Sequence, residues 1–158
     1  MSIDKVKQYL TQFGVQNKVM QFDVSSATVE LAAVAVGVEP AKIAKTLSFK
    51  VNGEQRAILI VTAGDVKVDN AKFKHYFGYK AKMLLPDEVF ELTGYNIGGV
   101  CPFDNPNGAE VYLDVSLQRF DIVYPACGTS NSAIGLDMNE LFAYSKAKEW
   151  IDVCKPKQ

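Results

Sequence analysis

Hydrophobic and polar positions alternate most regularly over residues 41–50, which read A-K-I-A-K-T-L-S-F-K. Ile43 and Leu47 share one phase of a two-residue period, and this period predicts a strand with one apolar face. Lys45 falls on the same apolar phase, where a lysine is costly to bury unless it has a partner or opens onto a cleft. Two interpretations stay open. Either Lys45 stands at a pocket mouth, or the strand begins only at Thr46 and Lys45 extends into solvent.

The other elements follow from the same kind of pattern and from the glycines and prolines between them. Apolar spacing and capping residues predict helices over residues 3–13, 29–36, 71–77 and 138–143, and a short one from Pro86. Strands are predicted over 18–23, 56–63, 111–115, 122–124 and 133–136, with a hairpin turn at Asn52-Gly53. The polar residues 155–158 are expected to fray. Since strands outnumber helices, the predicted fold class is α+β with a curved mixed sheet.

Composition narrows the class of protein. The 158 residues suit a single domain over residues 1–158, and a hydrophobic share of 48% is typical of a globular chain. Lys and Arg number 17 and Asp and Glu 18, so any contact with nucleic acid has to come from a local patch. The N-terminal sequence lacks the apolar core of a signal peptide, and no apolar run is long enough to span a bilayer. We therefore expect a cytoplasmic protein without a membrane partner.

The cysteines and the histidine argue against metal and thiol chemistry. Cys101, Cys127 and Cys154 are widely spaced, no C-x-x-C pair exists, and His75 is the sole histidine. A structural zinc site and a disulfide framework are therefore not expected, and neither is any metal or cofactor. A nucleophilic Cys101 would need a basic partner, but His75 falls among lysines of a predicted helix. A buried, inert thiol is the favoured interpretation.

Two loops rich in small residues are candidates for ligand binding. The backbone N–H groups around Gly98-Gly99 could approach a ligand and stabilise a carbonyl or a developing oxyanion. This pair matches neither G-x-x-x-x-G-K-[ST] nor G-x-G-x-x-G. The second loop, G-T-S-N-S at residues 128–132, offers hydroxyls and an amide. For each loop the alternative is an ordinary turn.

Lysines interleaved with tyrosines form a local basic cluster. Its members are Lys67, Lys72, Lys74, Lys80 and Lys82, with Tyr76 and Tyr79 between them. Such a cluster could follow an RNA backbone and stack a base, so Lys72, Lys74 and Lys80 are the predicted tRNA-binding residues. The alternative, an ordinary solvated helix face, is equally well supported by the sequence.

Four segments together carry a family resemblance. They are S-S-A-T-V-E-L-A-A-V-A-V-G-V at 25–38, I-A-K-T-L-S-F-K at 43–50, G-G-V-C-P-F at 98–103 and C-G-T-S-N-S-A-I-G-L at 127–136. In this order they resemble the YbaK-like family, free-standing relatives of the editing domain inserted in bacterial prolyl-tRNA synthetases. The resemblance covers nearly the whole chain. It implies a curved, partly barrel-like mixed sheet with flanking helices.

The same resemblance implies a reaction and its site. The reaction is hydrolysis, in trans, of the ester that joins a wrong amino acid to a tRNA, usually tRNA for proline carrying cysteine, alanine or another small residue. Lys45 matches the family's key lysine, and Gly99 falls in a glycine loop that contacts the aminoacyl group, so these two are the expected catalytic residues. The expected substrate-binding residues are Thr46, Gly98, Val100, Gly128, Thr129, Ser130, Asn131 and Ser132. Implied partners are aminoacyl-tRNA and prolyl-tRNA synthetase.

This chemistry agrees with the residues present. An aminoacyl ester is already activated, so a water or the vicinal ribose hydroxyl could attack once the carbonyl is polarised. Lys45 would anchor the terminal phosphate or ribose, and the backbone of Gly98 to Val100 would polarise the carbonyl. Two alternatives stay open: a non-catalytic module that binds aminoacyl-tRNA or a small aminoacyl ligand on the same fold, and a thiol hydrolase that uses Cys101.

Overall fold

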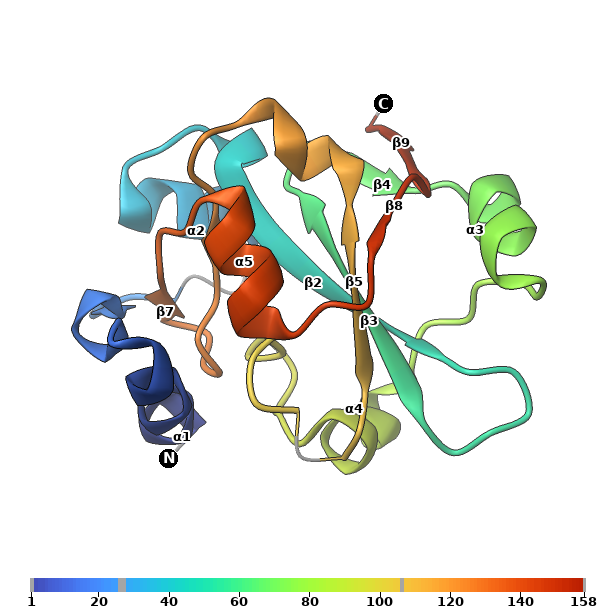
Figure 1. The fold of residues 1–158 in the computed structure, drawn as a ribbon, viewed down its shortest axis with the longest axis horizontal. Helices are drawn as coiled ribbons and strands as arrows, with labels where there is room; N and C mark the ends of the chain where they lie inside the picture. Colours follow the sequence, from blue (N-terminus) through green and yellow to red (C-terminus); the bar gives the residue numbers. More distant parts are fainter. Residues whose placement is uncertain (1, 26–27, 106, 158) are drawn as a thin grey trace.

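A five-stranded mixed sheet forms the centre of the protein, seen here in a computed structural model that describes residues 2–25, 28–105 and 107–157 (Figure 1). Its strand order is β6-β2-β3-β5-β8. Strands β2 and β3 pair antiparallel along their whole length, and the other neighbours run parallel. The bounds are β2 Ile43–Lys50, β3 Ala57–Ala63, β5 Glu110–Asp114, β6 Tyr124–Pro125 and β8 Trp150–Ile151. The predicted α+β class with a mixed, partly barrel-like sheet is confirmed, and the described strands form no closed barrel.

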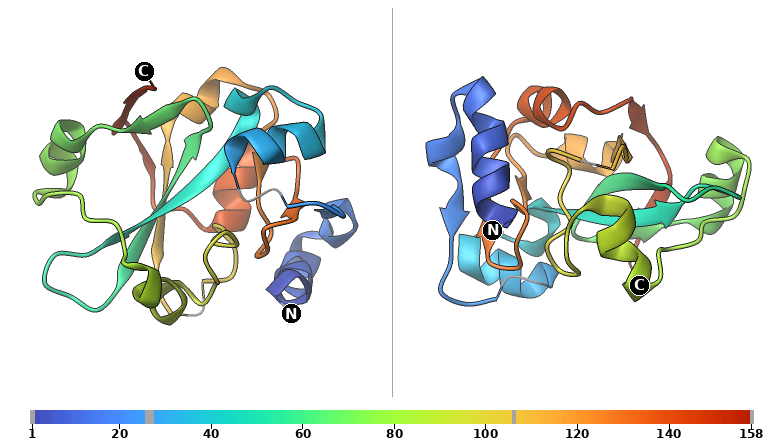
Figure 2. Two further views of the ribbon diagram at one scale, coloured as in Figure 1. Left: turned by 180° about the vertical axis from the view of Figure 1, so that it is seen from behind. Right: turned by 90° about the horizontal axis from the view of Figure 1, so that it is seen from below.

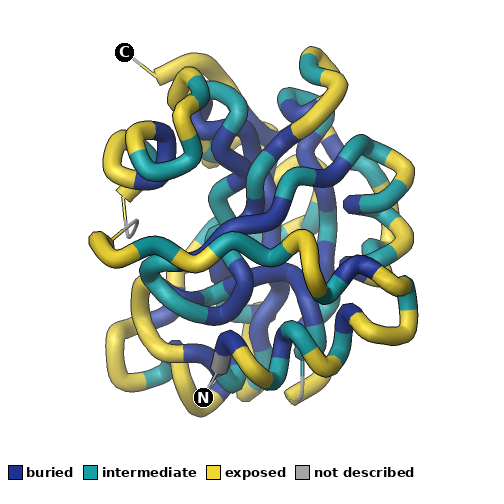
Figure 3. The backbone as a smooth tube through the Cα atoms, turned by 90° about the vertical axis from the view of Figure 1, so that its left-hand side faces the viewer, coloured by how far each residue is buried: buried dark blue, intermediate teal, exposed yellow. Residues whose placement is uncertain are grey.

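Strand β3 is the buried middle of this sheet. All seven of its residues are buried, which explains its nearly uninterrupted apolar sequence A-I-L-I-V-T-A. In Figure 3 the backbone is buried through the centre of the molecule and exposed at its outer turns. The core therefore packs against both faces of β3.

Helices cover the two faces of the sheet. Helix α5 (Met138–Ser145) lies over one face, and α2 (Val29–Val36) and α4 (Pro86–Thr93) lie on the other, as both views in Figure 2 show. Helix α3 (Asn70–Phe77) lies at the opposite end of the molecule from α2 (Figures 1 and 2). Helix α1 (Ser2–Leu10) adds Val6 and Leu10 to the core.

Local chemistry fixes where these helices begin and end. The Thr28 hydroxyl accepts a hydrogen bond from the Leu31 N–H at 3.1 Å, as expected of an N-cap. Asp69 caps α3 through the N–H groups of Ala71 and Lys72. The predicted helix over 3–13 ends earlier, at Leu10, and continues as the 3₁₀ turn Thr11–Phe13. Other 3₁₀ turns are Gln16–Lys18, Pro40–Lys42 and Val115–Arg119.

Two small strand pairs complete the fold. Strand β1 (Met20–Gln21) pairs with β7 (Ser132–Ala133), and both are shorter than the strands predicted over 18–23 and 133–136. Strand β4 (Val66–Val68) pairs with β9 (Cys154–Pro156). The prediction that the polar end of the chain frays was therefore wrong for Lys155 and Pro156, while Gln158 lies outside the described residues. Across the described ranges no helix is long and apolar enough to cross a membrane.

Candidate active site

A cavity of about 440 Å³ lies beside β2, between α2 and α4. This volume falls in the range of small-molecule pockets, about 300–1,000 Å³. Apolar side chains dominate its walls, including Val29, Ala32 and Val89. Five of the predicted site residues line it together, although they come from three distant parts of the sequence: Lys45, Thr46, Gly98, Val100 and Ser132.

One side of the cavity is an unpaired stretch of sheet edge. Strand β6 pairs with β2 only at Ile43 and Ala44, and residues 82–84 pair with it only from Ser48 onward. The Ser48 carbonyl and the Lys50 N–H turn toward residues 82–84, so Thr46, two residues earlier, turns its backbone groups to the same side. No described residue pairs with the Thr46 N–H or C=O there. A ligand in the cavity therefore meets one open backbone donor and one open acceptor.

Lys45 lines the cavity from within the strand, which is one of the two interpretations that the sequence left open. Because β2 begins at Ile43, the alternative in which the strand starts at Thr46 was wrong. The Lys45 side chain is half-buried, and its ammonium group donates a hydrogen bond to the carbonyl of Val66 in β4. Burial, reinforced by the nearby Lys157, lowers the pKa of Lys45 to about 8. The positive charge of Lys45 is therefore only partly compensated, because its hydrogen-bond partner is a neutral carbonyl.

In the loop around Gly98-Gly99, the backbone N–H groups differ in whether they are already hydrogen-bonded. The Gly99 N–H donates to the Asn96 carbonyl at 2.9 Å and is therefore engaged within the loop. Gly98 adopts the left-handed conformation, with φ of 87°, which glycine favours. Gly98 and Val100 line the cavity, and no described residue accepts a hydrogen bond from either backbone N–H. These two N–H groups, rather than that of Gly99, are the available donors for a carbonyl.

The second loop mostly satisfies its own polar groups. The Thr129 hydroxyl lies 2.8 Å from Asn131 Oδ1 and 2.9 Å from the Ser132 hydroxyl. The Asn131 amide donates to the Phe22 carbonyl at 2.9 Å, and Ser132 accepts from the Cys127 N–H at 3.1 Å. Of this loop, Ser132 lines the cavity, while Gly128, Thr129, Ser130 and Asn131 are absent from its lining.

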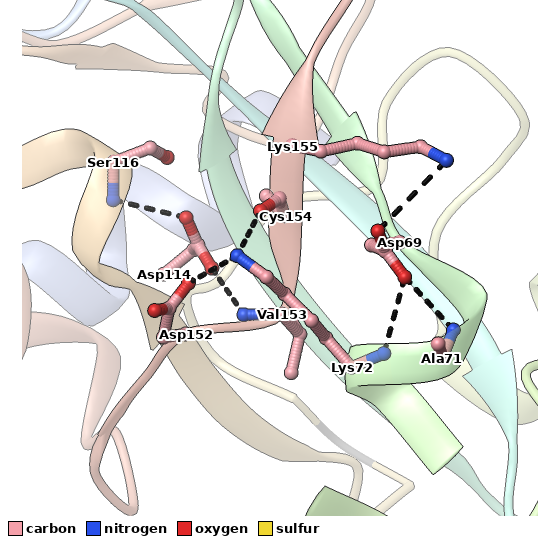
Figure 4. Close-up of polar contacts among 9 residues, drawn as sticks. All are labelled: Asp69, Ala71, Lys72, Asp114, Ser116, Asp152, Val153, Cys154 and Lys155. Carbon is pink, nitrogen blue, oxygen red and sulfur yellow. Dashed lines mark hydrogen bonds and ion pairs between the residues drawn. The ribbon is translucent and has the colours of Figure 1, made fainter. Parts of the chain in front are cut away.

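The predicted tRNA-binding lysines lie apart from the cavity, on and after α3. The Lys72 ammonium donates to the Cys154 carbonyl at 2.9 Å and to Asp152 at 3.2 Å, and so ties α3 to β9 (Figure 4). Lys74 and Lys80 are exposed. Lys72 therefore has a structural task, whereas the other two are available to a polyanion.

The predicted burial of Cys101 and the predicted exposure of His75 are both confirmed. Cys101, Cys127 and Cys154 are buried, and His75 is exposed. Burial raises the pKa of Cys101 to about 11, which keeps it a neutral thiol. Within residues 2–25, 28–105 and 107–157, no three His, Cys, Asp or Glu side chains gather as a metal site would require.

The sequence did not reveal five residues that contribute to the site or lie beside it. Val29 and Ala32 of α2 form part of the wall, and Met83 and Ile97 line it although both are largely exposed. Lys157 reaches Lys45 only because β9 pairs with β4. The small apolar residues of α2 predicted close packing, but the sequence did not show which elements the helix packs against. The pairing of β4 with β9 joins segments far apart in the sequence, so no local pattern predicts it.

The chain is similar to several known proteins and to one family of domains. Residues 23–144 match the family described as the aminoacyl-tRNA editing domain. Uncharacterized protein YwhH of Bacillus subtilis (strain 168) is 56% identical over 155 residues, which cover 98% of each chain. Proline--tRNA ligase of Thermotoga sp. (strain RQ2) is 30% identical over 76 residues, 48% of this chain and 13% of the ligase. The solved structure of a proposed trans-editing enzyme for prolyl tRNA synthetase superposes with a TM-score of 0.86 at 33% identity, covering 98% of this chain and 97% of that one.

The chain belongs to the aminoacyl-tRNA editing domain family, as its sequence motifs indicated.

Proposed function

We propose that this protein is a free-standing aminoacyl-tRNA deacylase, a hydrolase that removes wrong amino acids from tRNA. One observation carries the proposal. Lys45 lines the same cavity as Gly98 and Val100, whose backbone N–H groups are unpaired among the described residues. A cation for the nucleotide and donors for the carbonyl are what ester hydrolysis needs when the ester is already activated. The family match and the trans-editing relative support the same activity.

We further propose tRNA for proline, charged with cysteine, alanine or another small amino acid, as the substrate. The likeness to a prolyl-tRNA ligase and to a trans-editing enzyme for that synthetase supports this choice. A synthetase pocket for proline cannot strongly reject similar small side chains by binding alone, so a second hydrolytic site is useful. Prolyl-tRNA synthetase would then be the enzyme whose errors this protein corrects.

The residues suggest how the reaction proceeds. The Gly98 and Val100 N–H groups polarise the ester carbonyl, and a water, held by the vicinal ribose hydroxyl, attacks the carbonyl carbon and gives up a proton. A new C–O bond forms there, the bond to the ribose oxygen breaks, and that oxygen leaves with a proton. Lys45 holds the nucleotide so that the ester meets the loop. The backbone carbonyl of Thr46, which no described residue pairs with, would accept a hydrogen bond from the α-ammonium group of the amino acid.

A deacylation assay with matched substrates tests the proposal. Transfer RNA for proline would be charged separately with alanine, cysteine, serine, threonine and proline, and loss of each ester would be followed under single-turnover conditions. We expect at least one small non-cognate ester to be cleaved much faster than the prolyl ester. Binding of these tRNAs without hydrolysis of any ester would contradict a deacylase and favour the non-catalytic module.

A further inference from the structure

Two lysines from distant parts of the sequence meet beside the cavity. The Lys45 ammonium donates to the Val66 carbonyl in β4, and Val66 is paired with Pro156 of β9. The next residue, Lys157, donates its backbone N–H to the Asp65 carbonyl at 3.1 Å. This ladder places the exposed Lys157 one residue beyond the strand partner of Val66, beside the Lys45 ammonium, whose pKa it lowers. The site thus contains a second cation that neither the fold class nor the motifs assign.

Among the described residues, the groups that face the pair of cations supply no matching anion. Facing Lys45 are Lys157, the Cys154 thiol and the Asp65 carboxylate. Both oxygens of Asp65 are held by Arg119, at 2.6 and 3.0 Å, so much of its charge is already compensated. Burial raises the pKa of Cys154, so this thiol is neutral. Two neighbouring ammonium groups repel each other, and an anion bound between them would be attracted to both.

Strand β9 is anchored firmly enough to position such a cation. Lys72 of α3 binds the Cys154 carbonyl, and the Asp114 carboxylate accepts the Val153 N–H at 3.0 Å (Figure 4). The Lys155 ammonium lies 3.8 Å from the Asp69 carboxylate at the start of α3. Fixing the backbone on both sides limits where the Lys157 side chain can reach.

We propose that Lys157 and Lys45 together form a phosphate clamp, which binds the phosphodiester of the 3′-terminal nucleotide of the tRNA. This inference rests on the proposed function and extends it, because it assigns a positioning residue outside the cavity lining. Ammonium groups bind phosphate as point charges, and two of them share the charge of one phosphodiester. The clamp would hold the terminal ribose at a fixed distance from the Gly98 and Val100 N–H groups.

Substitution of Lys157 tests the clamp in the deacylation assay. In Lys157→Met we expect the tRNA concentration for half-maximal single-turnover rate to rise about tenfold, in line with the removal of one charged hydrogen bond. Lys157→Arg should retain most of the affinity. Lys155→Met is the matched control, since it removes a cation from the same strand that pairs with Asp69 instead. Equal effects of Lys157→Met and Lys155→Met would overturn the proposal.

The pH dependence of deacylation distinguishes a charge effect of Lys157 from a purely structural role, which would leave this dependence unchanged. Removing Lys157 takes away a neighbour that lowers the pKa of Lys45, so the pKa of Lys45 should rise. In Lys157→Met the alkaline fall in the rate at low tRNA concentration should therefore move to higher pH than in the wild type. An alkaline fall at an unchanged pH would contradict the proximity of the two ammonium groups.

A binding experiment separates this inference from the proposed function. The ammonium signals of Lys45 and Lys157 would be followed by NMR during titration with inorganic phosphate and, separately, with the trinucleotide C-C-A. Perturbation of both signals by the trinucleotide, with a weaker response of the Lys45 signal in Lys157→Met, would support the clamp even if no ester were hydrolysed. Perturbation by inorganic phosphate alone, or by neither probe, would overturn it, whatever the deacylation assay shows.

Discussion

Gly99 packs so closely against Gly128 that a Cβ atom on Gly99 would lie 2.6 Å from the Gly128 carbonyl oxygen. This contact joins the two glycine loops, backbone to backbone, next to the cavity that Gly98 and Val100 line. The requirement for glycine at position 99 is therefore one of space. Its neighbours depend on this contact for the direction in which their N–H groups point.

The substitution Gly99→Ala should displace the loop and slow deacylation by about tenfold or more, since backbone atoms cannot move aside as a flexible side chain would. Single-turnover rates of purified protein measure the effect. Gly14→Ala is the control. Gly14 has φ of 72°, and a Cβ atom there would meet nothing within 4 Å. This substitution therefore introduces backbone strain at a position outside the cavity, without a steric clash. A Gly99→Ala protein with the wild-type rate would contradict a role for this loop.

Among the lysines of the basic cluster, Lys74 and Lys80 should act on tRNA and Lys72 on stability. Replacing Lys74 and Lys80 by Gln should weaken tRNA binding and reduce the salt slope by about one for each phosphate that the protein no longer neutralises. Lys72→Gln should instead lower the melting temperature, because it releases α3 from Cys154 and Asp152. Binding isotherms at several salt concentrations and thermal melts separate these effects. An unchanged salt slope in the double variant would remove this patch from the tRNA site.

Deacylation should not depend on a thiol. We expect replacement of Cys101, Cys127 and Cys154 by Ala to leave the rate within about threefold of the wild type, because burial keeps these thiols neutral. A strong chelator should have no effect on the same reaction. Alanine is the better substitution, since a buried serine would need a hydrogen-bond partner. Loss of activity in a folded triple variant would favour the thiol hydrolase.

The lowered pKa of Lys45 has a consequence for stability. Its folded value is about 8 against an ordinary 10.5, so between these pH values the unfolded chain binds more protons than the folded protein. The free energy of unfolding should therefore rise with pH across this window. At pH 7, Lys45→Met should be more stable than the wild type by on the order of 1 kcal/mol, after allowing for screening of a half-exposed ammonium. Denaturant melts at pH 7 and pH 10 would show the difference shrinking, and a constant difference would contradict the shift.

The features that could be predicted from the sequence are those that depend on residues close together along the chain. The phase of Lys45 in β2, the apolar run of β3, the capping of α2 by Thr28 and the burial of Cys101 all follow from short-range spacing and side-chain chemistry. What it missed depends on pairings between distant segments. Such pairings place Lys157 beside Lys45 and leave the edge of β2 open at Thr46.

The most direct test of the proposed mechanism is single-turnover deacylation by Lys45→Ala, with thermal melting alongside. Removing the cation that positions the ester should reduce the rate at saturating tRNA by about 10²-fold or more while the protein stays folded. Lys45→Arg should restore little of the rate, since the guanidinium differs in shape and reach from the ammonium that meets Val66. A folded Lys45→Ala protein that cleaves the ester at nearly the wild-type rate would contradict the mechanism proposed here.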